Sequence, residues 1–132
     1  MPPPAHWIAI AIGGAVGSLL RYALFVAAVA VPGGSSIAGT LAANLVGCFA
    51  IGWLMGVVFQ HPEWMNESAA IGLRIGVLGG LTTFSTFAAE STGLLSQGRI
   101  IAAVAYIASS VLLGIFAVFA GGWFATPTEL AT

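Results

Sequence analysis

The chain has 132 residues, of which 59% are apolar and 5% are charged, and its mean hydropathy is +1.05. About a quarter of the residues of soluble domains are charged, so this composition excludes an ordinary water-soluble domain and a disordered chain. Three arginines, no lysine and four acidic residues offer no basic surface to phosphates, so no nucleic acid is expected as a partner. The single cysteine and two distant histidines exclude an internal disulfide and predict no metal cluster of these side chains. We therefore expect one compact all-α unit, residues 1–132, embedded in the lipid bilayer.

Four apolar stretches are long enough to cross a bilayer, which takes about 20 residues of helix. Clusters of proline, glycine and polar residues separate them. The apolar runs are continuous rather than alternating, which argues against the strands of a membrane barrel. These observations predict an integral membrane protein of the cell inner (plasma) membrane with four transmembrane helices. The expected spans are residues 7–31, 37–59, 68–97 and 100–124.

The basic residues specify the orientation of these spans poorly. Arg21 and Arg99 lean toward one side of the membrane and Arg74 toward the other, so the positive-inside rule has almost nothing to act on. Either few charges are needed for insertion, or the protein inserts both ways up. We interpret Arg74, near the start of the third span, as an interfacial anchor.

Glycines recur at a spacing of four along the predicted helices, which lets helix backbones approach closely in lipid. Packing within one chain accounts for most of them. Four short helices leave little room for an enclosed aqueous path, so a pathway would form more easily at or beside a subunit interface, and we expect a homo-oligomer, most simply a dimer. The clearest glycine sets are Gly13 with Gly17, Gly52 with Gly56, and Gly72 with Gly76 and Gly80.

Polar residues in the second span follow one helical face. Thr40, Asn44, Gly47, Cys48 and Ile51 have the spacing of a single stripe, and polar groups at membrane depth often mark function. The amide of Asn44 offers two donors and an acceptor without a charge. Two interpretations stay open for it, a contact with a transported ion or an interhelical hydrogen bond.

The third span contains the strongest anomaly, in which Gly79 and Gly80 precede a run of hydroxyl residues up to Phe87. Glycine weakens a helix, and hydroxyl groups compete for its backbone groups, so a local unwinding would break this helix near its middle. Such backbone is tolerated in a membrane only where protein buries it or where it lines a cavity, and its free carbonyls suit Na⁺. A continuous helix with back-bonded hydroxyls is the alternative.

Phe84 and Phe87 are three residues apart and therefore neighbours on one helix face. Among hydroxyl groups, their positive ring edges could face a small anion that has lost water. Arg21 in the first span and Glu90 in the third are charged positions that snorkelling or pairing would also explain. Further polar positions on the fourth span are Tyr106, Ser109 and Ser110.

Taken together, these segments make the chain resemble the Fluc/CrcB fluoride-channel family over essentially its whole length. Each motif is weak alone, and their order and spacing within four spans make the combination specific. The motifs are Gly13-Gly14-Ala15-Val16-Gly17-Ser18-Leu19-Leu20-Arg21-Tyr22, Gly39-Thr40-Leu41-Ala42-Ala43-Asn44, and Gly76-Val77-Leu78-Gly79-Gly80-Leu81-Thr82-Thr83-Phe84-Ser85-Thr86-Phe87 followed by Glu90.

The resemblance implies an antiparallel, dual-topology homodimer with two pores that export fluoride passively down its electrochemical gradient. It also implies a structural Na⁺ at the dimer interface, held by the backbone carbonyls of Gly79 and Thr82 from each subunit. Arg21 would attract anions at a vestibule, and Glu90 would lie beside the pore. At Gly114 this chain departs from the serine that some relatives carry. The expected fluoride-pore residues are Asn44, Phe84, Phe87, Thr83, Ser85, Tyr106, Ser110 and Thr40.

Three other interpretations are weaker. A small multidrug-exporter-like transporter of organic cations would need a central membrane carboxylate, but the first span has no acidic residue and the only acid inside any span is Glu90. An assembly factor would give no reason for polar residues to align across three helices. An enzyme is the least expected, since no nucleophile–base set is visible.

Overall fold

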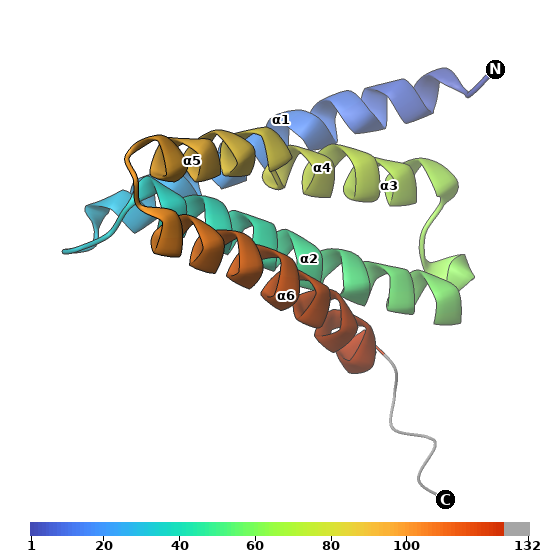
Figure 1. The fold of residues 1–132 in the computed structure, drawn as a ribbon. Helices are drawn as coiled ribbons and strands as arrows, with labels where there is room; N and C mark the ends of the chain where they lie inside the picture. The colour runs from blue at the N-terminus through green and yellow to red at the C-terminus, as the bar shows by residue number, and fades with distance from the viewer. Residues whose placement is uncertain (126–132) are drawn as a thin grey trace, which may run out of the picture.

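The computed structural model describes residues 1–125, and Figure 1 shows its long helical segments running back and forth along one direction. Each segment is long and apolar enough to cross a membrane. Residues 1–125 contain no strand, which confirms the prediction of an all-helical chain with four long apolar helices. The four segments are α1 (Pro4–Ala30), α2 (Ser36–Gln60), a composite third segment (Glu67–Ser96) and α6 (Ile100–Ala125).

Local sequence signals explain where the first two helices begin and end. Pro4 occupies the first turn of α1, where its missing N–H costs nothing. The turn after α1 contains Pro32 and then Gly33, whose φ of +78° favours glycine. Ser35 then caps α2, because its Oγ accepts a hydrogen bond from the Ala38 N–H at 3.2 Å.

The third segment consists of several pieces. After the short 3₁₀ turn η1 (Pro62–Trp64), it runs through α3 (Glu67–Ile71), the π-helical stretch η2 (Gly72–Val77), α4 (Leu78–Leu81) and α5 (Phe84–Ser96). Between α4 and α5 the chain is extended, with ψ of 155° at Thr82 and φ of −149° at Thr83. The third span is thus interrupted near its middle by two threonines.

The break lies later than the glycine pair that suggested it. Gly79 and Gly80 are both helical, and the unwinding begins at Thr82. Packing explains why Gly80 stays in the helix, since a Cβ at this position would lie only 2.7 Å from the Gly14 carbonyl oxygen of α1. The glycines therefore serve close helix contact, and the threonines supply the unwound backbone.

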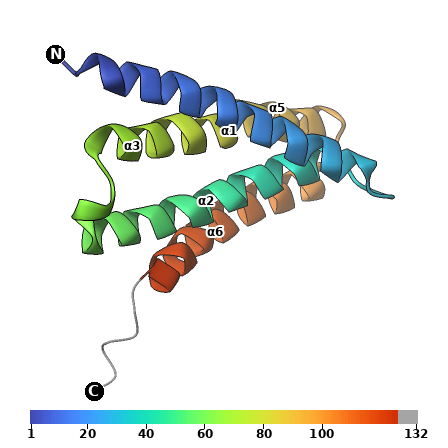
Figure 2. The same ribbon diagram turned by 180° about the vertical axis from the view of Figure 1, so that it is seen from behind.

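The helices pair in two groups. Figure 2 shows α1 running along the third segment, while α2 and α6 lie side by side on the other flank, and the contacts agree. Both pairings depend on glycine, because a Cβ at Gly17 would overlap the Val77 carbonyl oxygen and one at Gly121 would overlap the Phe49 carbonyl oxygen. The glycine stripes predicted from the sequence thus lie at contacts within one chain.

The outer surface is apolar, and one end of the bundle carries tryptophan. Figure 1 shows that α1 begins and α6 ends at the same end, where the turn after α2 also lies. These stretches contain Trp7, Trp123 and Trp64, and Trp7 and Trp64 are 64% and 67% exposed. Exposed tryptophans at the end of membrane helices are typical of an aromatic belt. Many large apolar side chains elsewhere are also exposed, as lipid or another protein surface requires.

Candidate functional site

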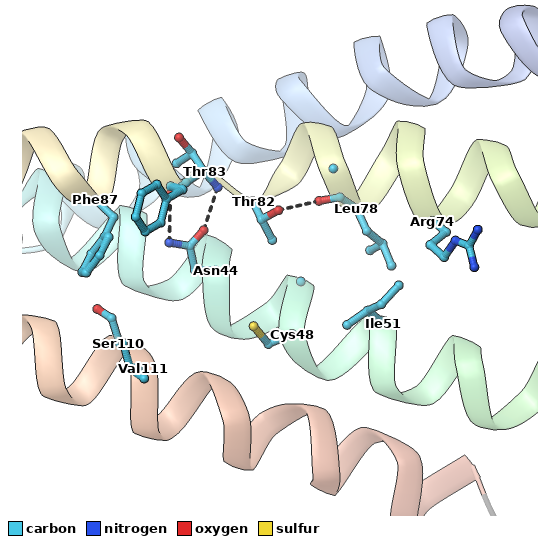
Figure 3. Close-up of a pocket in the computed structure, with 13 residues that line it drawn as sticks. Asn44, Cys48, Ile51, Arg74, Leu78, Thr82, Thr83, Phe87, Ser110 and Val111 are labelled. Carbon is cyan, nitrogen blue, oxygen red and sulfur yellow. Dashed lines mark hydrogen bonds between the residues drawn. The ribbon is translucent and has the colours of Figure 1, made fainter.

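Asn44 of α2 clamps the break in the third segment. Its Nδ2 donates a hydrogen bond to the Thr83 carbonyl oxygen at 3.2 Å, and its Oδ1 accepts one from the Thr83 N–H at 2.8 Å (Figure 3). Thr83 is 7% exposed, so these backbone groups would otherwise be costly to bury. Of the two interpretations of Asn44 drawn from the sequence, the interhelical hydrogen bond is present. The second N–H of the Asn44 amide takes no part in these two hydrogen bonds.

The clamp also explains why particular carbonyls are free. In a continuous helix the Gly79 carbonyl would accept from the Thr83 N–H and the Thr82 carbonyl from the Thr86 N–H. Here the Thr83 N–H donates to Asn44, and the Thr86 N–H donates to the Thr83 Oγ1 at 3.3 Å. The Gly79 and Thr82 carbonyls are therefore among those that the break releases from helical hydrogen bonding.

Hydroxyl groups gather where α5 begins. The Thr83 hydroxyl donates to the Thr86 Oγ1 at 3.1 Å and lies 3.3 Å from the Ser85 Oγ. The first N–H groups of α5 point toward this cluster, and the positive end of a helix dipole favours negative charge. The site thus combines neutral donors with a favourable field near the middle of the third segment.

Three aromatic rings continue from this cluster to α6. The ring centroids of Phe84 and Phe87 are 5.7 Å apart at 50°, and Phe87 meets Tyr106 edge-on with centroids 5.3 Å apart. Phe84 is 80% exposed, so its ring is free to meet a second surface. The predicted pairing of the two phenylalanines on one face is present.

Glu90 joins α2, α5 and α6 through its carboxylate. The Thr40 hydroxyl donates to Glu90 Oε1 at 3.0 Å, and the Tyr106 hydroxyl donates to Oε2 at 2.7 Å. Thr40 and Tyr106 are 5% and 6% exposed. The family resemblance implied that all three residues lie in or beside the pore, but the sequence did not reveal this network, because its hydrogen-bonded pairs are 50 and 16 residues apart.

Two cavities meet at Thr83. The first has a volume of about 420 Å³ and lies between α2, the third segment and α6 (Figure 3). Its lining includes Asn44, Phe84, Phe87 and Ser110, whose buried Oγ has no hydrogen-bond partner within residues 1–125. A buried hydroxyl without a partner is costly, so Ser110 keeps an unused donor and acceptor in the wall of this cavity.

The second cavity lies on the other side of Thr83. It has a volume of about 380 Å³ and is lined by Arg21, Thr40 and Thr86 as well as Thr83. Arg21 and Ser110 therefore belong to different cavities. Thr83, common to both linings, lies where the two spaces approach each other.

Cys48 and Arg74 also line the first cavity. The stripe on the second span already contained Cys48, whereas Arg74 was interpreted as an anchor and its place in this lining was missed. Gly114 is buried on α6, and a Cβ there would lie 3.5 Å from the Cys48 Sγ. No cluster of three metal-binding side chains occurs among the described residues.

This arrangement defines a class of protein: a small multi-pass membrane protein whose interrupted third helix lines largely apolar cavities with a few polar groups in their walls, and which carries no enzyme-like set of reactive groups in the part described. Residues 8–122 match the model of the CrcB-like protein family, Camphor Resistance (CrcB). The chain belongs to this family, which confirms the resemblance drawn from its motifs.

Several curated relatives cover most of the chain, and each is named a fluoride-specific ion channel, FluC. The one from Rhizobium etli is 43% identical over 116 residues, which is 85% of this chain and 89% of the relative. Those from Idiomarina loihiensis and Azotobacter vinelandii are 37% and 43% identical, over 87% and 86% of this chain and 88% and 91% of their own lengths. Family and helices together identify a multi-pass protein of the bacterial plasma membrane that is not an enzyme.

Proposed function

We propose that this protein is a fluoride-selective channel that lets fluoride leave the cell passively down its electrochemical gradient. The observation that carries the proposal is the buried, unpartnered Ser110 hydroxyl, which lines one cavity together with the phenyl rings and the Asn44 amide. Fluoride is a small anion and a strong hydrogen-bond acceptor. Such a cavity offers it replacement donors, which conduction requires.

The proposed path uses neutral groups, so that fluoride is bound without being trapped. Ser110, the second amide N–H of Asn44 and the hydroxyls of Thr83 and Ser85 would replace water, while the edges of Phe84 and Phe87 would face the dehydrated ion. Thr40 and Tyr106 would act beside this path, since both hydroxyls donate to Glu90. Arg21 would raise the local anion concentration in the neighbouring cavity.

The proposed functional unit is an antiparallel, dual-topology homodimer with two pores. The exposed Phe84 ring and the exposed backbone at Gly79 support a partner on this face. Chain orientation is weakly specified by three arginines, as a protein that inserts both ways requires. In this dimer the two phenylalanines of one pore would come from different subunits.

The proposed sodium site lies on the dimer axis. Each chain supplies two released carbonyls, at Gly79 and Thr82, and unwound backbone of this kind is a known type of Na⁺ ligand in membrane proteins. Two oxygen ligands are few for Na⁺, so a site shared between two copies fits these residues. A bound cation would stabilise the dimer and favour anions nearby without touching them.

Export of organic cations, the second candidate, is not favoured. Its required carboxylate would be Glu90, but both oxygens of Glu90 already accept hydrogen bonds from Thr40 and Tyr106. The relatives named above also give no support to it.

The proposed function is tested by ion release from liposomes. Purified protein in vesicles loaded with potassium fluoride is expected to release fluoride rapidly once valinomycin relieves the voltage, as followed with a fluoride electrode. Chloride-loaded vesicles should retain chloride, because a larger anion forms weaker hydrogen bonds in a narrow path. Equal release of both ions would reject selectivity, and uptake of an organic cation would support the second candidate.

The role of the rings is tested by Phe84→Ile and Phe87→Ile. Isoleucine fills similar space but lacks a positive ring edge, so each change should slow fluoride release by about tenfold, roughly the loss of one favourable contact of 1.4 kcal/mol. Size-exclusion chromatography should show the same assembly as wild type. Phe116→Ile is the control, since Phe116 is 70% exposed on α6 and lines none of the cavities described here. Unchanged release from both variants would remove the rings from the mechanism.

The sodium site is tested by preparing the protein throughout in N-methyl-D-glucamine instead of Na⁺. Loss of the ion should leave the Gly79 and Thr82 carbonyls facing each other across the axis without a cation, which lowers the melting temperature of the dimer and its fluoride release. Restoring Na⁺, but not Li⁺ or K⁺ at the same concentration, should restore both. Identical melting in all four cations would contradict the proposal.

A further inference from the structure

Arg74 lies at the junction of two cavities. It belongs to η2 and lines the 420 Å³ cavity that contains Asn44 and Ser110. It also lines a third cavity of about 390 Å³ between α2 and α3, whose wall includes Glu67 and Phe59. Figure 3 shows Arg74 at the end of the first cavity that is farthest from Phe87. The three cavities therefore form a series in which Arg74 is common to one neighbouring pair and Thr83 to the other.

The position of Arg74 needs an explanation because charge is costly inside a membrane. The residue follows Glu67, the first residue of its span, by seven positions, or about 10 Å of helix. At such depth an arginine needs water, an ionic partner or a path to the interface. No ion pair of Arg74 occurs among residues 1–125, where the only pairs involve His6 and His61. Arg74 is exposed and lines two cavities, so water in these cavities can solvate its charge.

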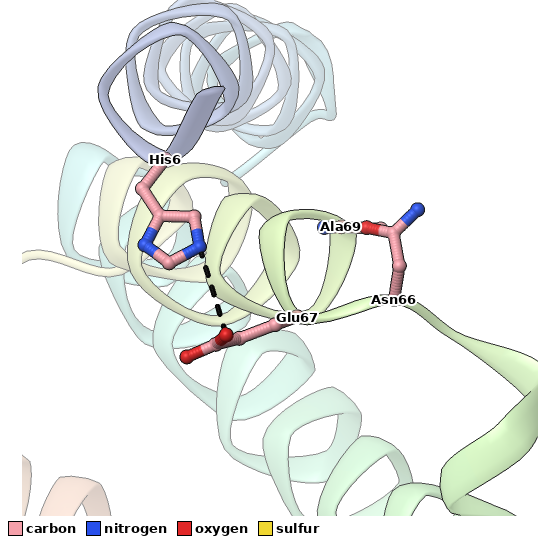
Figure 4. A network of polar contacts seen from close by, with 4 residues as sticks. All are labelled: His6, Asn66, Glu67 and Ala69. Carbon is pink, nitrogen blue, oxygen red and sulfur yellow. Dashed lines mark hydrogen bonds and ion pairs between the residues drawn. The ribbon is translucent and has the colours of Figure 1, made fainter. Parts of the chain in front are cut away.

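Glu67, the acidic residue in the wall of the third cavity, faces another group. Its Oε2 lies 4.0 Å from the Nε2 of His6, which is 7% exposed on α1 (Figure 4). The backbone around it is held by Asn66, whose side chain caps α3 by accepting from the Ala69 N–H at 2.9 Å. Arg74 thus shares the wall of the third cavity with Glu67, but no carboxylate of the described residues lies within 4.0 Å of its guanidinium.

We propose that Arg74 concentrates fluoride at the mouth of the cavity opposite to Arg21 and thereby sets the rate at low fluoride concentration. The inference rests on the proposed function. Arg21 lines the cavity on one side of Thr83 and Arg74 lines the cavity on the other, so a positive charge flanks the neutral donors at both ends. Cavities lined by one sign of charge raise the local concentration of the opposite ion. Arg74 is then a rate-determining residue and not only an interfacial anchor.

The test compares Arg74→Gln, Arg74→Lys and Arg74→Glu in the liposome assay at low fluoride and low ionic strength. Arg74→Gln should slow fluoride release by about three- to tenfold, the order expected for one charge acting over about 10 Å of partly hydrated space. Arg74→Lys should keep most of the rate, and Arg74→Glu should be slower than Arg74→Gln. Added potassium gluconate should reduce these differences, because salt screens charge.

Arg99→Gln is the matched control. Arg99 is exposed after α5 and lines none of the three cavities, so its loss should leave the rate within twofold of wild type. Equal fluoride-release rates of Arg74→Gln and wild type at low salt would overturn the inference about Arg74, whereas the proposed function would stand because the wild type still releases fluoride. Equal losses of rate in Arg74→Gln and Arg74→Lys that do not depend on salt would also overturn the inference, because they would indicate that Arg74 acts through packing and not through its charge. If Arg74→Gln does not assemble, the wild type itself decides, since a rate that does not fall with added gluconate contradicts steering by charge.

Discussion

Asn44→Ala should nearly abolish fluoride release and weaken the fold. The change leaves the Thr83 N–H and carbonyl without the two bonds of 2.8 and 3.2 Å that the amide supplies. Burying two unsatisfied backbone groups costs about 2–4 kcal/mol in total. If the conformation in which Asn44 holds Thr83 is destabilised by this free energy, the rate of fluoride release falls by about two orders of magnitude. Melting in detergent and release from liposomes would measure the two effects.

Two further variants distinguish the loss of the hydrogen bonds between Asn44 and Thr83 from the loss of an asparagine side chain elsewhere. Asn44→Asp keeps an acceptor for the Thr83 N–H but has no donor for its carbonyl, so it should lie between alanine and wild type in stability. Asn66→Ala removes an exposed helix cap and should cost about 1 kcal/mol with little change in fluoride release. Wild-type release from Asn44→Ala would show that the helix break does not need this clamp.

Gly17→Ala should produce the second large effect, on assembly of the helices. A Cβ at Gly17 would overlap the Val77 carbonyl oxygen and lie 2.9 Å from the Leu81 backbone nitrogen. Both atoms belong to helix backbone, so α1 must move away from the third segment. Overpacking of this kind costs about 1–3 kcal/mol, and the shift would also reach the break that follows α4. We expect a lower melting temperature and reduced fluoride release.

The matched control lies one turn away on the same helix. Gly14→Ala places a Cβ where no atom beyond its own helix lies within 4 Å, and alanine is the better helix former by about 1 kcal/mol. This variant should therefore melt at or above the wild-type temperature. Equal melting of Gly14→Ala and Gly17→Ala would mean that the close approach of α1 to α4 does not limit stability.

The order of the motifs predicted most of the fold and the family. Continuous apolar runs, broken by proline and glycine, predict membrane helices because a bilayer imposes one minimum length and requires internal hydrogen bonding. Glycines at a spacing of four predicted close helix contacts, because they lie on one face of a helix and have no side chain to keep a neighbouring backbone away. Gly79, Gly80 and the following threonines indicated an interruption within a few residues of where it lies.

The tertiary structure decided which groups the polar side chains meet. Asn44 could equally have faced an ion or a neighbouring helix, and only the placement of α2 beside Thr83 makes it a clamp on free backbone. Glu90 found its partners Thr40 and Tyr106 across large sequence separations. Arg74 resembled an anchor because depth along one helix says nothing about cavities between helices. Local chain chemistry sets the spans and the weak point of the third helix, whereas hydrogen-bond partners and cavity walls depend on packing that no short stretch of sequence contains.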